Sequence, residues 1–338
     1  MSDNLDNENS RITISDVAEA LGVSKTTVSR AISGKGRIGE TTRKRVLEYI
    51  SEHNYTPNVI AKSLAKSRTY NISWVLPDDY SLSDLPFFQN CLMGVSEVAA
   101  SMEYDILVSM VRGNDVSQLR RAVTNHKIDG AILSRTVEND VAAEYLLSAG
   151  VPFVAIGSTD IKGVIQVDND HKTACEELTS LLLLKGNKRL GLIGGNHTHM
   201  VTKYRLRGFT SAYEDSGEIL NNEYIYLDTD TRVRVEKAVD ELLEKGVDCI
   251  VSMDDSICTF VLNKLKKDNI NVPHDVKVAS FYNSLVLDNN VPSVTALNFD
   301  AVALGREACH TMLELIEGQS VEKRKLLGYD IFMKESTK

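Results

Sequence analysis

The side chains near the N-terminus that are best suited to chemistry lie in residues 13–34, TISDVAEALGVSKTTVSRAISG. Two short runs with helical spacing are joined by a turn at Gly22, and Ser24 suits the N-cap of the second helix. A helix-turn-helix of this kind exposes cationic and hydroxyl side chains that donate to phosphates and to base edges in a DNA major groove. The candidates are Thr13, Ser24, Lys25, Thr26, Thr27, Ser29 and Arg30, with Arg30 suited to a bidentate contact with guanine. The other interpretation is a small, solvated helical bundle.

A second group of polar and aromatic residues follows predicted strands in the rest of the chain. Asp168 and Asp170 come after one strand, and Arg205 opens the helix that follows another. Because ligands of open α/β sheets bind at the carboxyl ends of the strands, we expect these side chains to meet. Carboxylates and a guanidinium suit the hydroxyls of a sugar, and aromatic faces suit its ring. The aromatic candidates are Phe87, Phe88, Tyr204 and Tyr282.

Each of these ligand candidates has a structural alternative. Asp168 and Asp170 could cap the helix that begins near His171. Arg205 could form a surface ion pair, and Phe87 and Phe88 could belong to a hydrophobic core.

Other kinds of chemistry have no support in the sequence. His197 and His199 are separated by one residue, and no ligands at zinc spacing lie nearby. The phosphate-binding patterns G-x-x-x-x-G-K-[ST] and G-x-G-x-x-G are absent, and so is a G-x-S-x-G nucleophile motif. We therefore expect no enzyme activity, no metal site and no cofactor.

The elements that must position these residues change character at Tyr70. Before it, the pattern predicts three short helices, the third over 40–53, and a marginal helix after Pro57. After it, strands alternate with amphipathic helices, which predicts parallel sheets covered by helices and enough chain for two such units. Strands are expected at 72–76, 105–110, 130–133, 153–156, 190–193, 224–227, 249–253 and 278–281, with helices at 89–102, 116–126, 171–185, 201–216, 233–245 and 256–268.

Composition separates the two parts further. The 338 residues are 43% hydrophobic and 25% charged, which is typical of a globular protein. Residues 11–69 hold eleven basic and five acidic side chains, whereas the net charge of the whole chain is −9. A basic head on an acidic body is the asymmetry expected when only the head meets phosphate. The five scattered cysteines and the acidic, polar N-terminus favour a cytoplasmic setting.

Residues 13–68 resemble the lactose-repressor family of bacterial regulators. The matching pieces are D-V-A-E-A-L-G-V-S-K-T-T-V-S-R, then E-T-T-R-K-R-V, then N-Y-T-P-N-V-I-A-K-S-L. The resemblance implies a helix-turn-helix head at 11–54, a hinge helix and linker at 55–69, and a core similar to periplasmic binding proteins. In that core, 70–186 and 299–320 would form the N-terminal subdomain, and 187–298 and 321–338 the C-terminal one.

The resemblance also implies roles for particular residues. Lys25 and Thr26 would read bases, and Leu64 would enter the minor groove as a wedge, unless it packs on its own core. Tyr55, Asn58 and Ala61 would join it on DNA. Asp254 and Asn283 would join Asp168, Asp170 and Arg205 around an effector. The pieces V-L-P-D-D, P-F-F, V-D-N-D and V-T-K-Y-R-L-R-G-F resemble the maltose-regulator branch.

Together these features predict a homodimeric transcriptional repressor that binds a pseudo-palindromic operator and is released by a sugar such as maltose or a related α-glucoside. Two alternatives stay open. In the first, a corepressor or protein partner tightens DNA binding by the same fold. In the second, the chain is a sugar-binding protein without a regulatory role.

Overall fold

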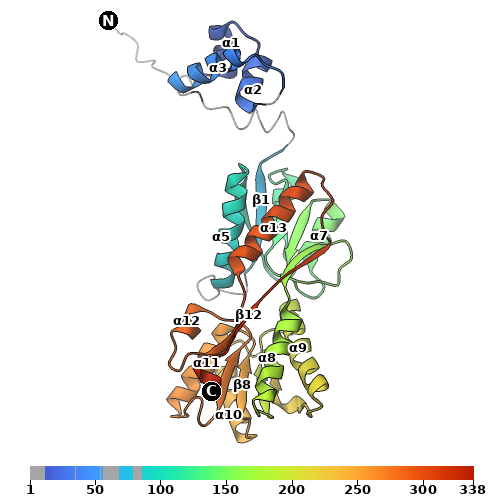
Figure 1. Ribbon diagram of the computed structural model, residues 1–338. Coiled ribbons are helices and arrows are strands. Elements are labelled where there is room, and N and C mark those ends of the chain that lie inside the picture. The colour runs from blue at the N-terminus through green and yellow to red at the C-terminus, as the bar shows by residue number, and fades with distance from the viewer. Residues whose placement is uncertain (1–11, 35, 54, 56–67, 79–85) are drawn as a thin grey trace, which may run out of the picture. The chain divides into compact units, whose positions relative to one another are not determined.

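Short apolar runs from Tyr70 onward form the strands of two parallel sheets, and the amphipathic stretches between them form the covering helices (Figure 1). The structure is a computed structural model that describes residues 12–34, 36–53, 55, 68–78 and 86–338. The chain divides into two compact units, Met1–Thr69 and Tyr70–Lys338. Each unit is described here by itself.

The first unit is called the head, and its described residues form three helices: α1 (Ile14–Leu21), α2 (Lys25–Ser33) and α3 (Glu40–Glu52). Gly22 ends α1 in the left-handed conformation, with φ of 65°, which a side chain would disfavour. One residue from each helix, Val17, Val28 and Val46, is fully buried in a shared core. Because helices this short are marginal alone, this shared core is what stabilises them.

The second unit, called the core, begins with a six-stranded parallel sheet in the order β11-β5-β4-β3-β1-β2. Helices α5 and α13 cover the face that contains the single tryptophan, Trp74, and helices α6 and α7 cover the other face. The strands are β1 (Asn71–Pro77), β2 (Asp105–Val111), β3 (Gly130–Leu133), β4 (Phe153–Ile156), β5 (Ile165–Asn169) and β11 (Arg324–Leu327); the helices are α5 (Pro86–Ser101), α6 (Ser117–Thr124), α7 (Val141–Ala149) and α13 (Ala301–Ile316).

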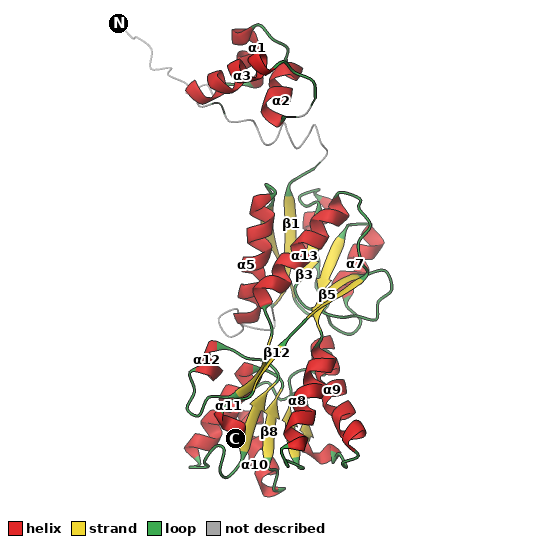
Figure 2. Cartoon of the chain, in the orientation of Figure 1, coloured by secondary structure: helices red, strands yellow, loops and turns green. Residues whose placement is uncertain are grey.

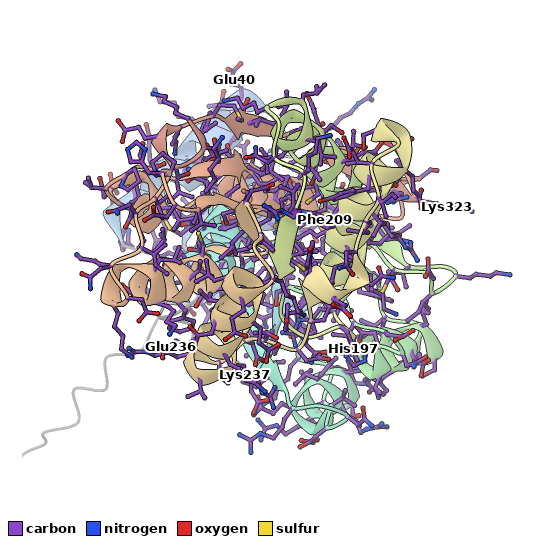
Figure 3. All side chains as sticks on the ribbon, turned by 90° about the horizontal axis from the view of Figure 1, so that it is seen from below. Glu40, His197, Phe209, Glu236, Lys237 and Lys323 are labelled. Atoms are coloured by element: carbon purple, nitrogen blue, oxygen red, sulfur yellow. The ribbon has the colours of Figure 1, made fainter. Side chains whose placement is uncertain are left out.

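The second sheet of the core has the order β12-β10-β9-β8-β6-β7 and is parallel except for β12. Helices α8 and α9 pack on one face, where Phe209 is fully buried, and helices α10 and α11 pack on the other (Figures 2 and 3). The strands are β6 (Leu190–Ile193), β7 (Ile225–Tyr226), β8 (Cys249–Ser252), β9 (Lys277–Ser280), β10 (Thr295–Asn298) and β12 (Asp330–Phe332); the helices are α8 (His171–Leu184), α9 (Met200–Ser216), α10 (Arg232–Glu244), α11 (Asp255–Lys267), α12 (Leu285–Asp288), η1 (Asn222–Tyr224) and η2 (Glu335–Thr337).

The subdomain boundaries predicted from the sequence differ from the sheets at two places. The prediction assigned α8 to the first subdomain, but α8 packs in the core of the second sheet. It assigned 321–338 to the second subdomain, but β11 pairs with β5 in the first sheet. Both sheets present similar apolar faces, so periodicity alone does not reveal which sheet an element joins.

The chain crosses between the subdomains three times: from β5 to α8, from β10 to α13, and from β11 to β12. All of the sheet strands involved lie at or next to one edge of their sheets, so the covalent connections are gathered on one side of the core. Within the described residues, none of the helices combines the length and apolarity needed to cross a bilayer.

Candidate functional site

Helix α2 presents a polar face to solvent and an apolar face to the head. Val28 and Ala31 are fully buried against the other two helices. On the other side, Lys25, Thr26, Ser29 and Arg30 are exposed. The structure therefore brings together four of the residues that the sequence predicts for DNA contact, on one face of one helix.

The cations on this face are available to an anionic partner. Within the described part of the head, the structure places no carboxylate at ion-pair distance from Lys25 or Arg30. Because guanidinium and ammonium groups donate hydrogen bonds without accepting them, they suit phosphate oxygens and the acceptor atoms of guanine. A helix with this face can enter a major groove.

Three further DNA candidates make hydrogen bonds within the head. The Thr13 hydroxyl and backbone N–H donate to a carboxylate oxygen of Asp16, at 2.8 and 2.7 Å. This arrangement lowers the pKa of Asp16, chiefly through the backbone bond from Thr13. Ser24 caps α2 by accepting from the N–H of Thr27 at 3.1 Å, and the two hydroxyls lie 2.9 Å apart. These residues position the helices, and their contact with DNA stays a prediction.

The remaining DNA candidates lie at the end of the head. Tyr55 is 8% exposed and packs into the head's core, which raises the pKa of its phenol by desolvation. This burial favours a packing role for its ring. Asn58, Ala61 and Leu64 lie outside the described residues.

In the core, polar groups gather where the strands of the two sheets end. Arg205, on α9, is 8% exposed and donates through Nη1 to the carbonyl oxygen of Met253, just after β8. Its guanidinium lies 6.0 Å from the centre of the Tyr282 ring, just after β9. Burial on this scale excludes the alternative of a surface ion pair for Arg205.

Asp168, at the end of β5, is buried but well hydrogen-bonded. Its Oδ2 accepts from the N–H and the hydroxyl of Ser158, both at 2.8 Å. Burial nevertheless raises the pKa of Asp168 to about 6, because desolvation outweighs these bonds and the charge of Arg205. Its Oδ1 lies 3.5 Å from Nε2 of His171, and burial lowers the pKa of that imidazole well below its usual range.

Aromatic rings flank these polar groups. Tyr282 is stacked with Phe299, with ring centres 6.4 Å apart, and meets Phe87 edge-on at 6.1 Å. Phe299 also meets the ring of His171 at 4.7 Å. Phe87 packs against the cores of both subdomains, so its ring lies between them, and its contact with a ligand stays a prediction. Phe88 is 5% exposed in the core of the first subdomain, which supports its structural alternative.

Three predicted effector residues have clear local partners. Asp170 caps α8 by accepting from the N–H of Thr173 at 3.1 Å, as the capping alternative states. Asp254 caps α11 by accepting from the N–H of Ile257 at 2.8 Å, and burial raises its pKa to about 6. The backbone N–H of Asn283 donates to the carbonyl oxygen of Leu297 at 2.7 Å, and the side-chain Oδ1 of Asn283 is buried.

The sequence reasoning missed several residues of this cluster. Asn169 and His171 flank predicted residues, and their polar atoms are buried, but they were not chosen as candidates. Phe299 follows β10, a strand that was not predicted. Among the described residues, no group of His, Cys, Asp and Glu side chains is arranged to hold a metal ion.

Comparison with known families finds two matches that together span most of the chain. The family described as periplasmic binding proteins and sugar binding domain of the LacI family matches residues 69–335. The family described as bacterial regulatory proteins, lacI family, matches residues 13–58.

Individual proteins are similar over nearly the full length. The HTH-type transcriptional regulator MalR of Streptococcus pneumoniae is 32% identical, over 96% of this chain and 99% of that protein. A structure of the transcriptional regulator CelR in complex with cellobiose is 26% identical, with a TM-score of 0.71 over 96% of this chain and 100% of that one. A lac repressor dimer bound to operator and an anti-inducer has a TM-score of 0.81 at 22% identity, over 96% of this chain and 99% of that one.

Proposed function

The chain belongs to the lacI family of bacterial regulatory proteins, whose members are DNA-binding transcriptional regulators and not enzymes, and on that premise we propose a specific role for it. It is a repressor whose core binds a disaccharide, maltose or a related α-glucoside. Binding of the sugar lowers the affinity of the head for its operator.

The observation that carries this proposal is a set of buried polar atoms between the subdomains. Nε of Arg205, Nδ1 of His171 and both side-chain polar atoms of Asn169 have no hydrogen-bond partner among the described residues. Leaving a buried polar group unpaired costs ~1–3 kcal/mol. A ligand that donates and accepts hydrogen bonds at the same place offsets that cost.

The chemistry of the site favours a sugar among such ligands. Sugar hydroxyls both donate to carboxylates such as Asp168 and accept from a guanidinium such as that of Arg205. The rings of Phe87, Tyr282 and Phe299 lie beside these groups and offer apolar faces to a pyranose ring. Maltose is proposed because of the sequence pieces typical of the maltose-regulator branch.

The DNA partner is proposed to be a pseudo-palindrome bound by a homodimer in the cytoplasm. One α2 helix reads only a few base pairs, and two related by a dyad read two half-sites. The core offers an apolar surface for self-association, because Met93 on α5 and Leu107 and Val108 on the edge strand β2 are exposed. Exposed apolar groups of this kind on an edge strand are typical of a protein-protein contact.

The test is a melting experiment with the full chain and a panel of sugars. A ligand that binds only the native state raises the melting temperature, by an amount equivalent to ~2.7 kcal/mol at a hundredfold excess over its Kd. We expect maltose to raise it, lactose to leave it unchanged, and Arg205→Lys to remove the maltose effect. If no α-glucoside changes the melting temperature, the sugar proposal is wrong.

The same sugars decide between induction and the corepressor alternative. Maltose is expected to weaken binding to a duplex selected by the protein from a random pool. A sugar that strengthens this binding would instead identify a corepressor.

A further inference from the structure

Besides the three chain crossings, the subdomains are joined by a non-covalent contact between two loops. One is 134–140, after β3, and the other is 196–203, which runs from the end of β6 into α9. Val137 and His199 form an antiparallel bridge across the gap. The N–H of Glu138 donates to the carbonyl of Thr198 at 2.8 Å, and the N–H of Met200 donates to the carbonyl of Thr136 at 3.2 Å.

An ion pair reinforces this bridge. Nζ of Lys203, on α9, lies 2.7 Å from a carboxylate oxygen of Glu138. The two side chains are 29% and 48% exposed, so water screens the pair only in part. The hydrogen bond from Lys203 is the main reason that the pKa of Glu138 is lowered.

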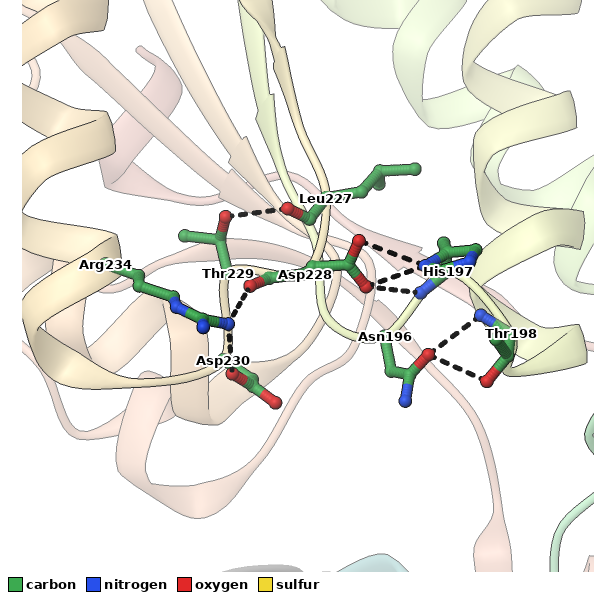
Figure 4. A network of polar contacts seen from close by, with 8 residues as sticks. All are labelled: Asn196, His197, Thr198, Leu227, Asp228, Thr229, Asp230 and Arg234. Atoms are coloured by element: carbon green, nitrogen blue, oxygen red, sulfur yellow. Dashed lines mark hydrogen bonds and ion pairs between the residues drawn. The ribbon is translucent and has the colours of Figure 1, made fainter.

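Hydrogen bonds within the second subdomain fix the position of the loop 196–203 (Figure 4). Asp228, just after β7, accepts from the N–H of His197 at 3.0 Å, and its carboxylate lies 2.9 Å from Nδ1 of the same residue. Asn196 accepts from the N–H and the hydroxyl of Thr198, at 2.8 and 2.7 Å. Arg234 of α10 in turn donates to the carbonyl of Asp228 at 2.9 Å. The carbonyl of Thr198 is therefore presented to Glu138 in a fixed position.

The contact between the two loops lies away from the chain crossings, so it opposes rotation of one subdomain relative to the other. The chain crosses between subdomains at β5, β11, β10 and β12, which lie at one edge of the two sheets. The bridge joins the ends of β3 and β6, which lie toward the other edge. A rotation about the crossings therefore separates the two loops. The loops also form part of the wall of a cavity of about 280 Å³, lined by both subdomains, which such a rotation would open.

We propose that the bridge between 136–138 and 198–200, with the Glu138–Lys203 ion pair, is a latch of the closed core, and that Glu138 and Lys203 are positioning residues for effector binding. The latch contributes to ligand affinity because a ligand held by both subdomains binds the closed form more tightly, and any contact specific to that form raises its population. Only the choice of sugar rests on the proposed function.

The test compares Lys203→Gln with Lys188→Gln in the full chain. Lys188 pairs with Glu218 at 2.9 Å, but both residues lie within the second subdomain, so this pair is a matched control. Hydrogen exchange is measured at the amides of Glu138 and Met200, which donate across the gap. Because partly exposed ion pairs are weak, we expect Lys203→Gln to speed their exchange by about two- to fivefold. Lys188→Gln should leave both amides unchanged.

Two further arms complete the design. The charge-swapped double variant Glu138→Lys/Lys203→Glu should return exchange to within about twofold of the original rate, because the Coulomb attraction is restored. Calorimetric titration with maltose should give an affinity about two- to fivefold weaker for Lys203→Gln and unchanged for Lys188→Gln.

The latch and the identity of the sugar are tested by different outcomes of these experiments. The latch is overturned if the two amides exchange at the same rate in the Lys203→Gln, Lys188→Gln and unsubstituted proteins. The role of the ion pair is overturned if the amides of the charge-swapped variant exchange as fast as those of Lys203→Gln. If the unsubstituted protein does not bind maltose, the proposed sugar is wrong, while the exchange arm still decides the latch.

Discussion

The carboxyl group of Asp168 gives the account a prediction with a definite sign. It is 5% exposed, and its pKa is raised from 3.8 to about 6 in the folded protein, mainly by burial. Between these values, the folded state holds a proton that the unfolded state has lost. The free energy of unfolding contributed by this group is therefore highest below pH 4 and falls as the pH rises through 6.

The size of the effect follows from the shift. Each pKa unit corresponds to ~1.4 kcal/mol, so a shift of about two units makes ionised Asp168 cost ~3 kcal/mol at pH 7. Asp168→Asn cannot ionise. Relative to the unsubstituted protein, the variant should gain up to ~3 kcal/mol between pH 4 and pH 7. The lost acceptor for Ser158 lowers the variant's stability by a similar amount at every pH and so does not alter this gain.

The assay is urea unfolding of the full chain at several pH values, followed by tryptophan fluorescence. Trp74 is the single tryptophan and is fully buried beside the same sheet, so its emission reports this subdomain. Asp228→Asn is the control, because the hydrogen bond from His197 lowers the pKa of Asp228 below 3.8, so the contribution of this group changes only below about pH 4 and the difference between the control and the unsubstituted protein should stay nearly flat from pH 4 to 7. If the difference between Asp168→Asn and the unsubstituted protein is flat from pH 4 to 7, the burial argument is refuted.

Three further predictions concern DNA reading, helix packing and assembly. Lys25→Ala should reduce discrimination between a selected duplex and its single-base variants by about tenfold, whereas Lys44→Ala should not; competition binding measures this. Gly94→Ala should lower the melting temperature by several degrees, because a Cβ there would lie 2.0 Å from the carbonyl oxygen of Val302, while Gly195→Ala, with no atom within 4 Å, should not. Val108→Asp should convert the dimer to a monomer in light scattering, and Val233→Asp, at an exposed valine on α10, should leave it intact.

Each of these three has an outcome that contradicts it. Equal discrimination by Lys25→Ala and the unsubstituted protein removes the base-reading role of that residue. Equal melting temperatures for the two glycine variants contradict the close approach of α5 and α13. A dimer that survives Val108→Asp shows that the β2 edge is not the contact surface.

The head could be predicted well because its signals are local. The Thr13–Asp16 capping box, the Ser24 cap and the left-handed turn at Gly22 all depend on residues within a few positions of one another. The spacing of Val17, Val28 and Val46 then fixes which sides face inward and leaves Lys25 and Arg30 outside. Local hydrogen-bond geometry and helical periodicity were sufficient for this part.

The core could be predicted only in outline because its organisation depends on distant contacts. The alternation of strands and helices predicted parallel sheets, but the strand before Asp168 was expected without bounds, and β10, β11 and β12 were not predicted. The four residues of β11 are mostly exposed, so they lack the apolar run that identifies a buried strand. The roles of Asp170 and Phe88 could also be assigned only from the structure. An aspartate suits both a helix cap and a ligand contact, and a phenylalanine suits both a hydrophobic core and a ligand contact.

The central claim is that a small molecule bound in the core controls the affinity of the head for DNA. The most direct measurement is the fluorescence anisotropy of a selected palindromic duplex titrated with the full chain, with and without maltose, in 0.15 M salt. The account predicts about ten- to hundredfold weaker binding with maltose, which corresponds to ~1–3 kcal/mol of coupling, and no such change for Arg205→Lys. Binding that does not distinguish the selected duplex from random DNA, with or without sugar, would contradict it.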